Sequence, residues 1–76
     1  MDIRRIVGQN IRRLRIKAEL SQEGLAFAAH LDRTYVSGVE RGVRNPTVVV
    51  VAELASALEV EPYVLLKRPE RRSSEQ

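Results

Sequence analysis

The chain has 76 residues and a formal net charge of +3, with no cysteine and no tryptophan, one histidine, two tyrosines and one phenylalanine. This length allows one small domain, whose core must consist mainly of Leu, Val, Ile and Ala. Without cysteine there is no disulfide framework and no thiolate metal site, and a single histidine cannot build a metal site alone. No apolar run approaches the roughly 20 residues that cross a membrane, so we expect a cytoplasmic protein.

The charges are distributed unevenly along the chain. Residues 1–18 carry six basic side chains and one acid, and residues 33–44 carry three arginines and one acid. Residues 19–32 and 45–66 each carry three acids and no lysine or arginine. This alternation favours one positive face, which would attract the phosphate backbone of a nucleic acid. A solvated charged surface without a partner is the alternative interpretation.

The first predicted helix covers about residues 3–18. Its apolar positions recur at helical spacing and form one stripe, which consists of Val7, Ile11, Leu14 and Ala18. Gly8 interrupts this pattern and costs roughly 1 kcal/mol of helix propensity, so we expect a close packing contact there.

Two short helices follow, joined by a tight turn. Ser21 is a suitable N-cap for a helix over about residues 22–29, and Asp32 for a helix over about residues 33–41. Gly42 then ends the second of these helices.

The helix at 33–41 has more polar than apolar surface. Val36 and Val39 face inward at i, i+3, and Arg33, Thr34, Ser37 and Gly38 fall on the other side. A short helix with polar side chains near its N-terminal end can enter the major groove of DNA and read base edges.

The last two predicted helices cover about residues 48–58 and 62–67. Thr47 caps the first and Pro62 suits the first position of the second. The valine run at 48–51 taken alone predicts a strand, but apolar residues continue at helical spacing and no partner strand exists elsewhere, which favours a helix. Residues 68–76 are polar and are predicted to form a disordered tail.

Four segments, taken in order, carry a resemblance to a known family. They are IRRLR in the first helix, LSQEGLA opening the second, LDRTYVSGVERGVRNPT through the third and its exit, and LASALEV in the fourth. They resemble the Cro/lambda-repressor-like, or XRE-like, helix-turn-helix family over about residues 7–66. The segment LDRTYVSGVERGVRNPT is most similar to the controller proteins of restriction–modification systems.

The resemblance implies an all-α, compact five-helix DNA-binding domain over residues 1–67. The helix-turn-helix would occupy about residues 21–41, and dimerisation about residues 47–66. His30 stands where the family usually has glycine, so we expect a left-handed backbone at this histidine.

Within this family, the third helix supplies the side chains that contact DNA bases. Arg33 has a planar fork that binds guanine O6 and N7 bidentately, and Thr34 offers a hydroxyl or a methyl group. Ser37 would contact a base or a phosphate. The residues expected on the DNA backbone, where contacts set affinity and register, are Gln22, Tyr35, Arg41, Arg44 and Asn45. Plain solvation is the alternative for Arg33, and a partly packed ring for Tyr35.

Arg15 and Glu40 match family positions that often form a structural ion pair between the first helix and the end of the third. The resemblance therefore implies that Glu40 supports the fold, although it is next to the site.

Four consecutive valines at 48–51 cannot all face one core on a helix. We infer that at least one, Val49 or Val50, is left for a partner, and plain core packing is the alternative. The expected homodimer interface consists of Val49, Val50, Val60, Pro62, Tyr63, Leu65 and Leu66.

The sequence thus predicts a transcriptional regulator that binds a near-palindromic operator in double-stranded DNA as a homodimer and blocks or recruits RNA polymerase. It predicts no cofactor, metal, membrane or small-molecule ligand. An enzyme is disfavoured because one histidine and scattered acids supply neither a nucleophile with its base nor paired carboxylates. The alternative is an antitoxin-type interaction protein, which would neutralise a partner protein through the residues after Lys67 and autoregulate its operon.

Overall fold

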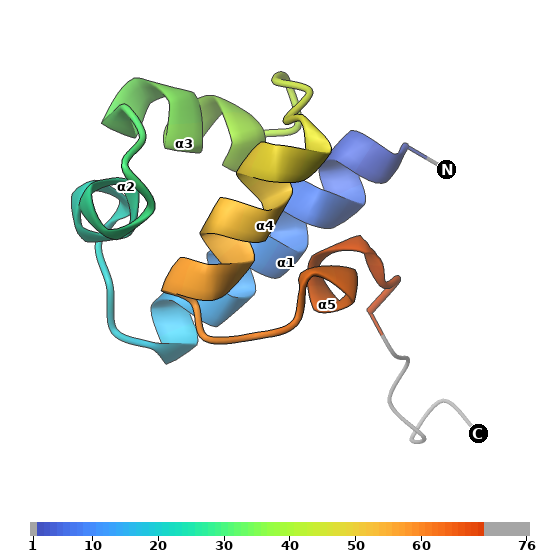
Figure 1. Cartoon of the computed structure of the whole chain (residues 1–76). Coiled ribbons are helices and arrows are strands. Elements are labelled where there is room, and N and C mark those ends of the chain that lie inside the picture. The colour runs from blue at the N-terminus through green and yellow to red at the C-terminus, as the bar shows by residue number, and fades with distance from the viewer. Residues whose placement is uncertain (1, 70–76) are drawn as a thin grey trace.

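The computed structural model describes residues 2–69, which form five α-helices and no strand (Figure 1). In chain order these are α1 (Ile3–Lys17), α2 (Gln22–Ala29), α3 (Arg33–Glu40), α4 (Val48–Ala57) and α5 (Pro62–Leu66). The predicted all-α architecture is confirmed. The predicted ends of α1, α3, α4 and α5 lie one residue too late. Of the predicted tail, residues 70–76 lie outside the described part of the chain.

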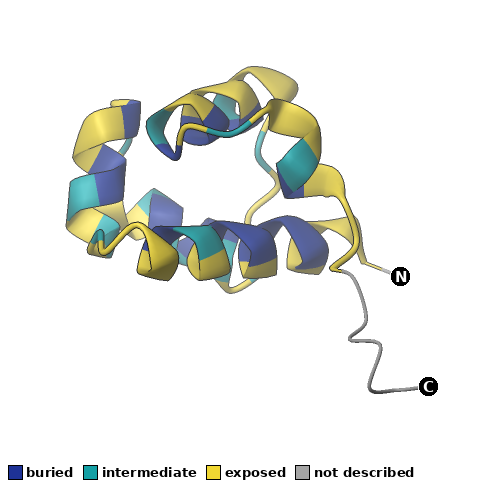
Figure 2. Cartoon of the chain, turned by 90° about the horizontal axis from the view of Figure 1, so that it is seen from below, coloured by how far each residue is buried: buried dark blue, intermediate teal, exposed yellow. Residues whose placement is uncertain are grey.

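The main helix–helix contacts close into a ring. α1 contacts α3 and α5, α2 contacts α3 and α4, and α4 contacts α5. Each helix therefore packs against two others, and the buried residues form stripes on the inner sides of the helices (Figure 2).

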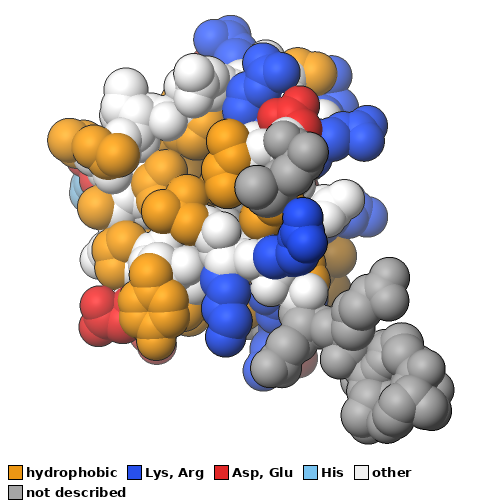
Figure 3. Space-filling view, turned by 90° about the vertical axis from the view of Figure 1, so that its right-hand side faces the viewer, with side chains coloured by type: hydrophobic (Ala, Val, Ile, Leu, Met, Phe, Trp, Pro, Cys, Tyr) orange, Lys and Arg blue, Asp and Glu red, His pale blue; other side chains and the backbone are white. Residues whose placement is uncertain are grey.

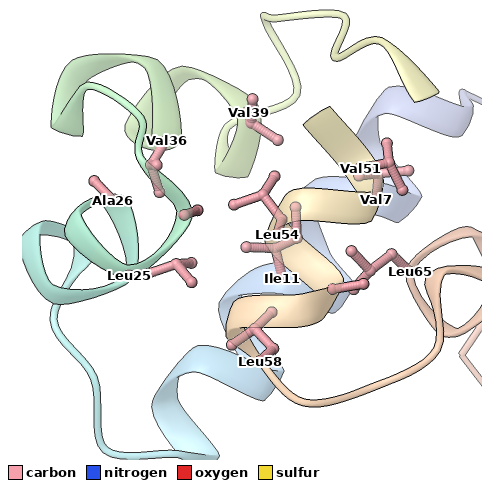
Figure 4. Packing of buried hydrophobic residues seen from close by; sticks show 12 residues of the cluster. Val7, Ile11, Leu25, Ala26, Val36, Val39, Val51, Leu54, Leu58 and Leu65 are labelled. Carbon is pink, nitrogen blue, oxygen red and sulfur yellow. The ribbon is translucent and has the colours of Figure 1, made fainter. Parts of the chain in front are cut away.

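The core inside this ring is aliphatic, and its side chains come from all five helices (Figure 4). The largest fully buried apolar side chains are Ile11, Leu25, Val36, Val39, Leu54 and Leu65. Phe27, by contrast, is 85% exposed, so the one phenylalanine contributes little to the core. The predicted stripe on α1 is correct at Val7 and Ile11 but wrong at Ala18, which is exposed at the helix end.

Polar side chains cap the helix starts much as the sequence predicts. Ser21 Oγ accepts the first-turn N–H of α2 at 2.9 Å, and Thr47 Oγ1 accepts that of α4 at 3.1 Å. Asp32 occupies the N-cap position of α3, but its carboxylate makes no capping bond. Instead, Asp32 Oδ2 accepts a hydrogen bond from the Thr34 hydroxyl at 2.7 Å.

Three helices end at a left-handed residue that is not glycine. His30 has φ 61°, as expected, and Glu19 and Glu59 have φ 61° and 60° after α1 and α4. The left-handed conformation costs an L-residue about 1–2 kcal/mol. Gly42, with φ 78°, follows α3 at no such cost.

Gly8 marks the place where α1 and α3 cross. A Cβ atom at Gly8 would lie 2.6 Å from the backbone oxygen of Glu40, and closer still to that of Val39. The expected close contact is therefore present, and the absence of a side chain at Gly8 brings the end of α3 against α1.

Two polar side chains of α1 are buried, Asn10 and Arg15, and the sequence analysis did not predict the burial of Asn10. Its Nδ2 donates to the backbone oxygens of Leu65 at 2.9 Å and Lys67 at 2.8 Å, with a longer contact of 3.3 Å to Val64. These carbonyls belong to the end of α5, where a helix leaves its acceptors without partners. Asn10 thus ties α5 to α1.

Candidate nucleic-acid interface

α2 and α3 form a helix-turn-helix pair at one end of the molecule, on the left side in Figure 1. The turn is held by a hydrogen bond from Leu31 N to Ala26 O at 2.8 Å, directly after the left-handed His30. Leu25 of α2 and Val36 of α3 are both fully buried in the shared core. These two side chains anchor the pair to the core, and the polar residues of the pair remain at the surface.

Arg33 and Thr34, two of the three predicted base-reading residues, are exposed at the start of α3. Arg33 Nη1 donates to Gln22 Oε1 at 3.3 Å, so the N-terminal ends of α2 and α3 lie together. Ser37, the third, is half-buried one turn further along α3. Helix N-termini carry unpaired N–H groups that favour anions, which suits a phosphate beside Gln22.

A buried ion pair lies beneath these residues. Arg15 Nε is 2.6 Å and Arg15 Nη2 3.1 Å from the two carboxylate oxygens of Glu40, and the side chains are only 10% and 3% exposed. Arg15 Nη1 also donates to Leu20 O at 2.9 Å. Gln22 Nε2 donates to Glu40 Oε1 at 3.0 Å, so one hydrogen-bonded chain runs from Arg15 through Glu40 and Gln22 to Arg33.

The loop after α3 returns across the outer side of that helix. Arg41, Arg44 and Asn45 are all exposed, and the Arg44 guanidinium lies 5.5 Å from the centre of the Tyr35 ring. Gly38 was expected on the open side of α3 but is buried, because the Arg44 side chain lies over it.

Arg5 is a basic residue near this loop that sequence reasoning did not single out. Its Cγ would lie 3.1 Å from a Cβ atom at Gly42, so the first turn of α1 lies beside the exit of α3. The excess of basic residues at 1–18 indicated a basic N-terminal segment, but it identified neither Arg5 nor this contact.

A second surface is apolar and lies over α4 and α5. Val48, Val49, Tyr63 and Leu66, which we call the apolar surface, are 81%, 62%, 65% and 46% exposed. In Figure 3 apolar side chains gather on this face, with lysine and arginine beside them. A groove of about 160 Å³ runs from Val48 and Leu66 to Ile3 at the start of α1.

The expected homodimer interface needs correction within this surface. Leu65 is completely buried in the single chain, because it packs in the core between α1 and α4, and so no partner can reach it. Val50 and Val60 are half-buried against the same core, and Pro62 is exposed. Sequence reasoning also missed Val48, which is more exposed than Val49.

Among residues 2–69 there is no group of three or more His, Asp or Glu side chains placed to hold a metal ion. None of the helices described is long and apolar enough to cross a membrane.

The helix-turn-helix family model matches residues 11–65, which include all of the α2–α3 pair. The chain belongs to this family. The control protein C.BamHI of Bacillus amyloliquefaciens is 44% identical to it over 66 residues, 86% of this chain and 82% of that protein.

Two solved structures are similar to this helix-turn-helix protein along most of its length. The restriction–modification controller protein C.AhdI of Aeromonas hydrophila has a TM-score of 0.80 and 52% identity, with 82% of this chain and 94% of that chain covered. The controller protein C.Esp1396I, solved as a tetramer with its natural 35 base-pair operator, has a TM-score of 0.78 and 35% identity, with 86% of both chains covered. These findings confirm the family inferred from the sequence and the predicted class of function, a helix-turn-helix transcriptional regulator.

Proposed function

We propose that the protein controls transcription by binding a near-palindromic operator as a homodimer, and that the genes it controls belong to a restriction–modification system. The observation that carries the proposal is the polar start of α3, where Arg33 and Thr34 are exposed and Arg33 contacts Gln22 of α2. Arginine at this place in a helix-turn-helix suits bidentate binding of guanine in the major groove.

The apolar surface supports the proposed homodimer. Val48 and Val49 of α4 and Tyr63 and Leu66 of α5 are exposed apolar side chains, and Val48 and Leu66 line one groove. Exposed apolar patches of this kind mark sites of protein association. A two-fold axis through this surface would place two copies of α3 in successive major grooves on one side of the DNA. Their half-sites would then be about 10 base pairs apart.

The restriction–modification role is supported by the relatives. C.BamHI and the control protein C.SmaI of Serratia marcescens are each 44% identical to this chain. We expect two dimers to occupy a longer operator, as the C.Esp1396I tetramer does on its own 35 base-pair site. Occupancy then blocks or recruits RNA polymerase, according to where the operator lies.

Selection of bound duplexes from a random DNA library, followed by sequencing, tests the proposal. We expect enrichment of a two-fold symmetric site whose half-sites are about 10 base pairs apart, or a multiple of that. Circular dichroism of the same protein sample establishes that it is folded. Folded protein that enriches no sequence would overturn the proposal.

A further inference from the structure

The outer face of α3 is built from two segments of the chain. Thr34 and Gly38 are one helical turn apart and share the side opposite the buried Val36 and Val39. A Cβ atom at Gly38 would lie 2.6 Å from Arg44 Cγ and 3.6 Å from both Cδ and Nε of that arginine. The Arg44 side chain therefore occupies the place that a side chain at position 38 would have.

Two further contacts hold Arg44 at this place. Gly38 O accepts hydrogen bonds from Val43 N at 3.0 Å and from Arg44 N at 3.3 Å, which fixes the loop to the end of α3. The Arg44 guanidinium lies over the Tyr35 ring at 5.5 Å, a distance at which a cation is attracted to the face of an aromatic ring. The Arg44 side chain, which belongs to a loop, is thus held against α3.

We infer that Arg44 is a specificity-determining residue, which binds a guanine in the major groove. The guanidinium would reach the DNA from one turn of α3 further along that helix than Thr34. The inference rests on the proposed function and changes the role expected for Arg44, which was contact with the DNA backbone. Gly38 and Tyr35 are then positioning residues, since one leaves room for the arginine and the other orients its planar group.

The chemistry of the side chain separates the two roles. A guanidinium matches guanine O6 and N7 with two parallel hydrogen bonds, whereas an ammonium group serves a phosphate well as a point charge. Phosphate contacts weaken binding to all sequences alike, and base contacts are lost at one position only.

The first test compares the folded wild type with Arg44→Lys and Arg44→Ala on the selected operator and on every single-base variant of it. For base reading, both variants lose operator affinity by about 5- to 150-fold and no longer discriminate at one base pair per half-site. Arg41→Ala is the matched control, because it removes the same charge from the exposed end of α3, and it should weaken all duplexes equally. An Arg44→Lys variant that keeps the wild-type sequence preference would overturn the inference.

The second test uses Gly38→Ala, whose added methyl group meets Arg44 and no buried core atom among its nearest neighbours. The variant gains helix propensity, so it should fold. It should lose discrimination at the same base pair as Arg44→Ala, and the double variant should be no worse than Arg44→Ala alone. Additive losses, or loss at a different base pair, would contradict the shared role of Gly38 and Arg44.

These outcomes are distinct from failure of the proposed function. If wild-type protein enriches no operator, the proposed function fails before any variant is compared. If it enriches an operator and Arg44→Ala weakens every duplex equally, only the inference about Arg44 fails.

Discussion

At the scale of single residues, Glu40 joins the buried Arg15 to Gln22, which lies beside the predicted base-reading Arg33. Glu40→Ala would leave the Arg15 guanidinium buried without its carboxylate, since that side chain is only 10% exposed. Removing one partner of a buried pair costs about 3–5 kcal/mol. We expect a loss of that size in the free energy of unfolding, measured by urea denaturation.

Glu23→Ala is the matched control, because Glu23 is an exposed acid at the start of α2, and its effect should lie within about 0.5 kcal/mol. Where Glu40→Ala remains folded, it should still select the wild-type operator. An unchanged urea midpoint would show that the ion pair contributes nothing to stability.

Arg33 gives the second prediction at this scale. Arg33→Ala should cost about 1–3 kcal/mol of operator binding and relax selection at one base pair per half-site. Its exposed position and its single hydrogen bond to Gln22 mean that the fold should be unaffected. Titrations on the operator and on random DNA decide the matter, and equal losses on both would remove Arg33 from base reading.

α5 depends on the rest of the molecule at the scale of elements. It has five residues, too few to be stable as an isolated helix, and it is held by the buried Leu65 and by the Asn10 amide. Asn10→Ala leaves the carbonyls at the end of α5 without their donor, so we expect a loss of about 1–3 kcal/mol.

Hydrogen exchange provides the measurement. The amides of α5 should exchange faster in Asn10→Ala than in wild type, by more than those of α2. Gln9→Ala, at the exposed neighbouring position of α1, should leave both helices unchanged. Equal acceleration in α2 and α5 would mean that Asn10 does not act on α5 in particular.

The elements themselves were predictable because their signals are local. Ser21, Thr47 and Pro62 mark helix starts through contacts within one turn, and the apolar spacing distinguishes the helix at the valine run from a strand. Leu65 and Leu66 are adjacent and chemically identical, so only the docking of α5 decides which one enters the core.

The same limit applies to the candidate site. Arg33 and Thr34 could be named from their places in a recognisable motif, and the structure has both at the surface. The burial of Gly38 by the Arg44 side chain could not be predicted, because it depends on the path of the loop that brings Arg44 back across α3. Asn10 reads as an ordinary polar helix residue until α5 is placed against it.

At the scale of the whole molecule, the two surfaces with proposed roles lie apart. The α2–α3 pair lies at one end, and the apolar surface lies over α4 and α5 on another side (Figures 1 and 3). A stable interface buries about 800 Å² on each partner and is centred on a few large side chains, often tyrosine. Tyr63, which is 65% exposed on α5, is the large side chain of the apolar surface and the natural centre of such an interface.

Tyr63→Glu should therefore dissociate the proposed homodimer without unfolding the chain. It removes an aromatic anchor and adds a charge, and the loss of association free energy should be about 2 kcal/mol or more. Sedimentation velocity at several protein concentrations measures the change, with circular dichroism to establish that the helices remain. Operator affinity should fall with dimerisation, because a monomer contacts one half-site.

Phe27→Glu is the matched control, because it makes the same aromatic-to-acid change at an exposed residue outside the apolar surface. Phe27 is 85% exposed on α2, which lies on the opposite side of the molecule from α5 in Figure 1. The same aromatic-to-acid change there should leave the sedimentation coefficient unchanged. If Phe27→Glu dissociates the dimer and Tyr63→Glu does not, the two subunits meet through α2 and not through α5. The two copies of α3 would then have a spacing different from the roughly 10 base pairs expected for an interface at α5.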